Sequence, residues 1–202
     1  MNKLVILFCI SGCTYDKKDF DFNTKDLRPV SSFKEGDTIY FEGPSGDLDT
    51  IMIYKIDSIQ KRSWGAFMAP AAENHLFVAI KHLPNHILWT YTVTEGSTFD
   101  TKVYYQNLIT VTKRPQTKEV SYSIAFKDFS ASNGKNGTLG AIRKDTVIVN
   151  RKNITNFYEI ESDQPQSKSD LGCMETIYWT DNEGLMAYKN KRGDWWTKIS
   201  KR

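Results

Sequence analysis

The feature that most constrains this fold is a two-residue alternation of apolar and polar side chains, which recurs along the chain. Residues 119–126 carry an apolar side chain at every second position. Because successive side chains of a strand point to opposite faces, this pattern is typical of a strand with one buried face. Residues 103–111 keep the same period, and residues 113–118 between the two segments are polar and contain a proline. The two segments are therefore predicted to form a hairpin.

Similar patterns predict strands in the rest of the chain. They cover residues 37–41, 49–59, 145–150, 154–161, 176–180, 185–188 and 195–199, and most are separated by turns rich in glycine, asparagine or aspartate. The only candidate helix lies around 70–83, where Leu76, Ile80 and Leu83 recur at helical spacing, although residues 77–80 fit a strand equally well. We therefore expect an all-β, mainly antiparallel domain, a sandwich or partly open barrel with at most one short helix.

The N-terminus has the pattern of an export signal. A lysine at position 3 precedes a short apolar run from Leu4 to Ile10, which is far below the ~20 residues of a spanning helix. Residues 10–13, Ile-Ser-Gly-Cys, resemble the lipobox of bacterial lipoproteins, in which the cysteine thiol receives a lipid and becomes the first residue after cleavage. We expect a signal peptide at 1–12, lipidation at Cys13, a charged tether at 13–32 and one β-rich domain at 33–202.

Charge and cysteine content argue against a nucleic-acid partner and against an intrachain disulfide. The chain has 27 basic and 24 acidic residues, and removal of Lys3 with the signal peptide leaves 26 against 24. This small excess gives no reason to expect a nucleic-acid partner. After Cys9 is removed and Cys13 is lipidated, only Cys173 is left, so we expect no intrachain disulfide.

We found no recognisable catalytic constellation and expect neither an enzyme, a cofactor nor a metal site. His75, His82 and His86 are close in sequence, but their spacing does not match a familiar zinc motif. Asp47 and Asp49 form the only close acidic pair near a glycine-rich turn, and we interpret them as turn residues.

Aromatic residues near the C-terminus are the candidate ligand-binding residues. Trp179, Tyr188, Trp195 and Trp196 lie among several lysines and arginines. The adjacent Trp195 and Trp196 must point to opposite faces of a strand. An exposed tryptophan beside lysines could stack on a sugar ring or hold an anionic glycan or lipid headgroup. In the alternative interpretation, both faces are covered and the lysines keep an edge strand soluble.

Several segments resemble uncharacterised small envelope lipoproteins of Bacteroidota. The resemblance lies in residues 176–189 (Thr-Ile-Tyr-Trp-Thr to Tyr-Lys) and 193–196 (Gly-Asp-Trp-Trp), and in the Asp-Thr-Ile strands at 37–39 and 49–51. It implies a place in the outer membrane, facing the periplasm or the cell surface. Asp-Ser/Thr-apolar triplets also resemble the O-glycosylation sites of that phylum, with acceptors at Thr38, Thr50, Ser58 and Thr146.

Three functions are consistent with these features. We favour a lipid-anchored envelope protein without catalysis, which binds a glycan or a partner protein or has a structural role. One alternative is a carrier whose curved sheet holds a lipid or acyl chain in a concave apolar pocket. The other is a hydrolase of envelope sugars, which would need two carboxylates about 5–10 Å apart in a cleft.

Overall fold

Eleven strands form one antiparallel sheet in the computed structural model, which describes residues 21–63, 71–83, 105–132, 142–149, 152–162 and 173–200. The strands are β1 (Thr38–Glu42), β2 (Leu48–Ser63), β3 (Ala71–Leu83), β4 (Gln106–Arg114), β5 (Glu119–Phe126), β6 (Phe129–Ala131), β7 (Ile142–Val149), β8 (Lys152–Glu161), β9 (Met174–Thr180), β10 (Gly184–Asn190) and β11 (Trp195–Ile199). A short 3-10 helix, η2 (Arg28–Val30), precedes them. Among the residues described, no helix has the length and apolar character needed to cross a membrane.

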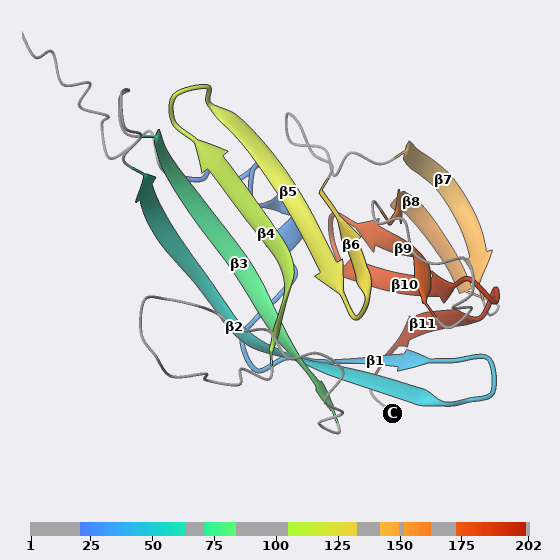
Figure 1. Cartoon of the computed structure of the whole chain (residues 1–202). Helices are drawn as coiled ribbons and strands as arrows, with labels where there is room; N and C mark the ends of the chain where they lie inside the picture. The colour runs from blue at the N-terminus through green and yellow to red at the C-terminus, as the bar shows by residue number, and fades with distance from the viewer. Residues whose placement is uncertain are drawn as a thin grey trace, which may run out of the picture.

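The sheet curls into a half-barrel (Figure 1). Its strand order is β6-β5-β4-β3-β2-β1-β11-β10-β9-β8-β7, so β1 and β11 pair in the middle of the sheet although they are far apart in sequence. The curl brings the β6 edge against β9, where the backbone N–H of Met174 lies 3.1 Å from a carboxylate oxygen of Asp128. The expected all-β antiparallel fold is thus confirmed, in the form of a partly open barrel and not of a sandwich.

The candidate helix at 70–83 is a strand. Residues 71–83 form β3, which pairs with β2 on one side and β4 on the other. Val78 and Ile80, two residues apart, are both fully buried. β-Branched residues suit a pleated surface between two neighbouring strands. Pairing with β2 and β4 therefore favours a strand over a helix, a choice that the sequence pattern left open.

The concave face of the sheet is filled by the protein's own side chains. The largest fully buried side chains are those of Trp179, Tyr188, Phe41, Phe126, Phe129, Phe157, Ile51, Ile53, Ile80, Leu108, Ile109 and Ile177. All of them except Phe157 belong to the main core cluster. A smaller cluster, which contains Phe157 and Tyr178, lies on the opposite face of β8 and β9. The described part of the concave face is therefore a packed core.

The N-terminal segment, residues 21–33, packs between the two arms of the half-barrel. Val30 and Phe33 belong to the core and are 7% and 6% exposed. The indole Nε1 of Trp179 in β9 donates to the carbonyl of Pro29 at 3.2 Å. Residues 21–32 were expected to belong to a tether, but here they are an integral part of the domain. Outside η2 this segment has no regular secondary structure, so its apolar side chains show no regular period. The sequence pattern therefore did not reveal that they are buried. Residues 1–20, including Cys13, lie outside the described residues.

Candidate functional site

A polar cleft of about 440 Å³ lies where the N-terminal segment crosses the sheet. Its volume is within the usual range for small-molecule sites. The N-terminal segment and η2 supply one wall, and the β4–β5 turn, β5, β8 and the β9–β10 turn supply the others. The lining residues are Asn23, Lys25, Asp26, Arg28, Lys118, Val120, Tyr158 and Asp181.

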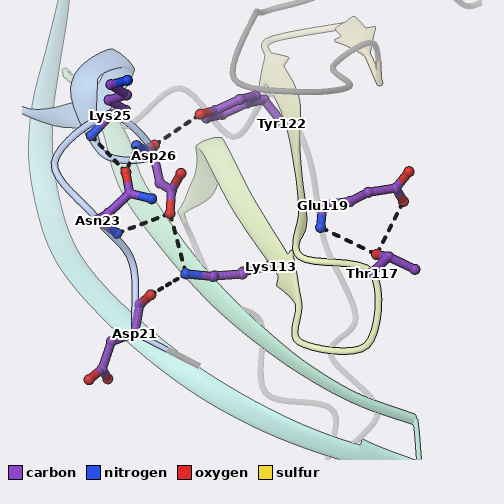
Figure 2. A network of polar contacts seen from close by, with 8 residues as sticks. All are labelled: Asp21, Asn23, Lys25, Asp26, Lys113, Thr117, Glu119 and Tyr122. Carbon is purple, nitrogen blue, oxygen red and sulfur yellow. Dashed lines mark hydrogen bonds and ion pairs between the residues drawn. The ribbon is translucent and has the colours of Figure 1, made fainter. Parts of the chain in front are cut away.

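A network of hydrogen bonds holds the first wall in place (Figure 2). The side-chain oxygen of Asn23 accepts the backbone N–H groups of Lys25 and Asp26, at 2.9 and 3.0 Å. The Asp26 carboxylate in turn accepts the N–H of Asn23 at 3.0 Å. The Lys113 ammonium of β4 lies 3.5 Å from this carboxylate and also donates to the carbonyl of Asp21. These contacts fix the wall to the sheet.

Tyr122 adds a second bond between this wall and the sheet. Its hydroxyl donates to the carbonyl of Asp26 at 3.0 Å (Figure 2). Burial, and then the nearby negative charge of Asp26, raise the pKa of Tyr122 above its ordinary value. The phenol therefore stays protonated at neutral pH and keeps donating this bond.

The charges that line the cleft favour an anion. Three cationic residues face two carboxylates. The Asp181 carboxylate accepts from the Tyr158 hydroxyl at 3.5 Å and lies 3.9 Å from Arg28. In contrast, neither Lys25 nor Lys118 forms an ion pair with another residue that the structure describes, and both are exposed. Because the carboxylates are already compensated, these two ammonium groups give the cleft a positive potential.

A second polar cluster lies in the barrel interior at its other end. We call Asp49 of β2, Lys127 of the β5–β6 turn and Tyr188 of β10 the clasp. The Lys127 ammonium is 2.8 Å from the Asp49 carboxylate and donates to the Tyr188 hydroxyl at 3.1 Å. That hydroxyl donates to the same carboxylate oxygen of Asp49 at 2.5 Å. The clasp thus joins three parts of the sheet that are separated in the strand order.

The charge states of the clasp follow from its surroundings. Burial would raise the pKa of Asp49, but the nearby His82 and the charge and hydrogen bond of Lys127 hold it well below its usual value. Burial and the Asp49 carboxylate raise the pKa of Tyr188 far above its usual value, so the phenol stays neutral. The ammonium also lies over the rings of Tyr188 and Trp196, with centroids at 4.8 and 5.4 Å. The three groups satisfy one another, which favours a structural role.

Lys127 is held in an unfavourable backbone conformation. Its φ is 54°, in the left-handed region that residues other than glycine seldom adopt. Gln106 of β4 fixes this geometry, because its side-chain oxygen accepts the Lys127 N–H at 2.8 Å and its side-chain nitrogen donates to the Lys127 carbonyl at 2.9 Å. The ammonium is thereby aimed into the barrel.

The clasp changes the interpretation of Asp49. Asp49 is not a turn residue as expected, because β2 already begins at Leu48 and the Asp49 side chain points inward beside the core.

His82 and His75 lie on opposite faces of β3, so they cannot share a metal ion. His86 lies outside the described residues. In the ranges that the structure covers, no group of three His, Cys, Asp or Glu residues could hold a metal.

The structure separates the four candidate aromatic residues. Trp179 and Tyr188 are 0% and 2% exposed, so their proposed role as direct ligand contacts is not supported. Trp196 is partly buried and stacks on Tyr188 with ring centroids 5.7 Å apart, whereas Trp195 lies on the other face against Tyr178. The expected opposite orientation of the adjacent tryptophans is confirmed. None of the four residues lines the cleft.

The four candidate O-glycosylation acceptors differ in exposure. Thr38, Ser58 and Thr146 are exposed, whereas Thr50 is only partly exposed. Exposure leaves a hydroxyl open to an enzyme, and modification of all four acceptors stays a prediction.

Sequence patterns did not predict the cleft, although one local signal points to its first wall. Asn23 and Asp26 are three residues apart just before Pro29, which is a spacing typical of a capped turn. Among the lining residues that the structure describes, no nucleophile lies beside a base. Comparisons with protein-family models, with curated proteins and with solved structures found no match to this chain.

Proposed function

We propose that this chain is a lipid-anchored protein of the outer membrane that binds a small anionic group in the cleft without catalysis. The positive potential from Lys25 and Lys118 is the observation that carries this proposal. The lipobox at residues 10–13 supports the anchor at Cys13. The polar composition of the cleft suits a substituent of an envelope glycan or another charged envelope molecule.

The chemistry of the lining favours binding over hydrolysis. Among the described residues that line the cleft, there is no histidine, cysteine, serine or threonine. Asp26 is bonded to Asn23 and Lys113, and Asp181 accepts from Tyr158. A hydrolase of sugars needs one carboxylic acid that can release its proton to the leaving group. Carboxylates already compensated by cations and donors are poorly suited to that role.

The packed concave face argues against a carrier of acyl chains. Such a carrier needs an apolar cavity that can take up a long chain. The described concave face is instead filled by its own aromatic and aliphatic side chains, many with no exposed surface. The cleft is too polar to replace that cavity.

Binding can be tested with a matched pair of sugars, glucose 6-phosphate and glucose, by titration calorimetry. We expect only the phosphorylated sugar to bind, and we expect its affinity to fall as salt is added. The double variant Lys25→Ala/Lys118→Asn should bind it about tenfold more weakly, because each exposed charge contributes up to about 1 kcal/mol. Asparagine is chosen at position 118 because Lys118 has a φ of 56°, which asparagine tolerates. Arg192→Ala, in the exposed β10–β11 turn, is the control. Equal binding of both sugars would contradict an anion site.

The anchor is tested separately by labelling cells with a radioactive fatty acid. The wild-type chain should incorporate label, and Cys13→Ala should incorporate none, because the thiol of Cys13 is the predicted acceptor of the lipid. The Cys173→Ala variant serves as the matched control and should be labelled like the wild type. Label in Cys13→Ala at the wild-type level would rule out this anchor.

A further inference from the structure

The cleft lies close to the predicted lipid along the chain. Only residues 14–20 separate Cys13 from Asp21, the first residue that the structure describes. The eight steps from the Cα atom of Cys13 to that of Asp21 span at most about 28 Å when fully extended at ~3.5 Å each. Asp21 is itself fixed to the sheet through the Lys113 ammonium, next to Asp26 of the cleft wall (Figure 2). The chain therefore enters the domain at the cleft.

A short connection makes weak binding to the anchoring membrane effective. When the ligand lies in the membrane that holds the anchor, its binding to the cleft is effectively intramolecular. The effective concentration of the ligand is then of the order of millimolar. Residues 13–20 contain two lysines and two aspartates, so they carry no net charge that would compete with the cleft. The cationic side chains of the cleft are thus the groups that would interact with an anionic membrane surface.

The cations of the cleft are accessible and suited to phosphate. Lys25 and Lys118 are exposed, and the Arg28 side chain beside Asp181 is 64% exposed. Guanidinium and ammonium groups are the side chains that bind phosphate oxygens most strongly. An anionic leaflet attracts such basic groups within about one Debye length, ~8 Å at physiological salt.

We propose that the anion bound in the cleft is the phosphate of a lipid headgroup in the membrane that anchors the chain. This inference rests on the proposed function, since it names the ligand of the same cleft. The cleft end of the barrel then faces the membrane. The β10–β11 turn, at the other end of β10 from Asp181, points away from it. The lipid at Cys13 and the headgroup in the cleft would together fix the orientation of the domain.

Vesicle flotation tests this orientation with a chain that begins at Thr14 and so lacks the lipid. Every strand and core residue that the structure describes lies within residues 21–200, so this chain retains all of them. We expect it to float with vesicles of phosphatidylcholine that contain phosphatidylglycerol, and not with vesicles of phosphatidylcholine alone. The Lys25→Ala/Lys118→Asn variant should require about tenfold more anionic lipid, and Arg192→Ala should behave like the wild type. Free glycerol 3-phosphate should compete.

The outcomes distinguish this inference from the proposed function. Binding of free glycerol 3-phosphate or glucose 6-phosphate, without flotation, would overturn the headgroup as ligand and leave the anion cleft in place. Absence of all three interactions would overturn both proposals. Flotation that is equally strong for the wild type and the double variant would show that other surface charges bind the membrane, and would also overturn the inference.

Discussion

Replacement of Lys127 by methionine is expected to lower the free energy of unfolding by about 2–3 kcal/mol. Methionine keeps much of the length of the side chain but removes the ammonium. The Asp49 carboxylate then loses the one cation that the clasp provides. The side chains of Asp49 and Lys127 are 14% and 21% exposed. A charge left unpaired in a fully buried site costs about 3–5 kcal/mol, and partial exposure reduces this cost. Urea denaturation followed by tryptophan fluorescence measures the difference.

Two further variants identify the cause of that loss. Asp49→Asn/Lys127→Met removes both charges and should recover most of the stability, because the penalty arises from the unpaired carboxylate. Lys55→Met breaks the exposed ion pair between Lys55 and Asp57 and should have a much smaller effect. A double variant no more stable than Lys127→Met would contradict a charge-based role for the clasp.

The pH dependence of stability has a defined sign. The pKa of Asp49 is lower in the folded chain than in the unfolded chain, where it is about 3.9. Such a group contributes stability above its unfolded pKa, and that contribution is lost as pH falls through the folded pKa. The difference between wild type and Lys127→Met should therefore be complete at neutral pH and shrink below about pH 4.

The strands could be predicted because their signal is local. In β5, Val120, Tyr122 and Ile124 alternate along the sequence, and the structure buries all three. The curl of the sheet had no such signal. It depends on the pairing of β1 with β11 and on the contact between β6 and β9, which join residues far apart in sequence. Local patterns favour a sandwich and a partly open barrel equally.

The candidate site was harder to predict than the fold for the same reason. Lys25, Lys118 and Asp181 come from three distant segments, and no spacing relates them. The clasp did have a local signal, because Asp49 shares the two-residue period of Ile51 and Ile53, whose side chains are fully buried. Continuing that period to Asp49 places a carboxylate inside the barrel, where a cation must accompany it.

The second large effect is expected at the contact between the start of β10 and the N-terminal segment. Gly184 has a φ of +71°, and a Cβ atom there would lie 2.4 Å from Cζ of Phe33. Gly184→Ala should lower the free energy of unfolding by about 3 kcal/mol, since overpacking of a core contact adds 1–3 kcal/mol to a backbone penalty of about 1 kcal/mol. Urea denaturation again provides the measurement.

Gly36→Ala is the matched control, because Gly36 has a φ of +85° but no atom within 4 Å of the added Cβ. It should show the backbone penalty alone, about 1 kcal/mol. Equal losses in the two variants would mean that the Phe33 ring yields freely and that the N-terminal segment is only loosely packed. A larger loss in Gly184→Ala, with coupling to Phe33→Ala in a double-mutant cycle, would show that this segment unfolds together with the sheet. Because the same segment forms one wall of the cleft, that result would also mean that the cleft is preformed and not assembled by its ligand.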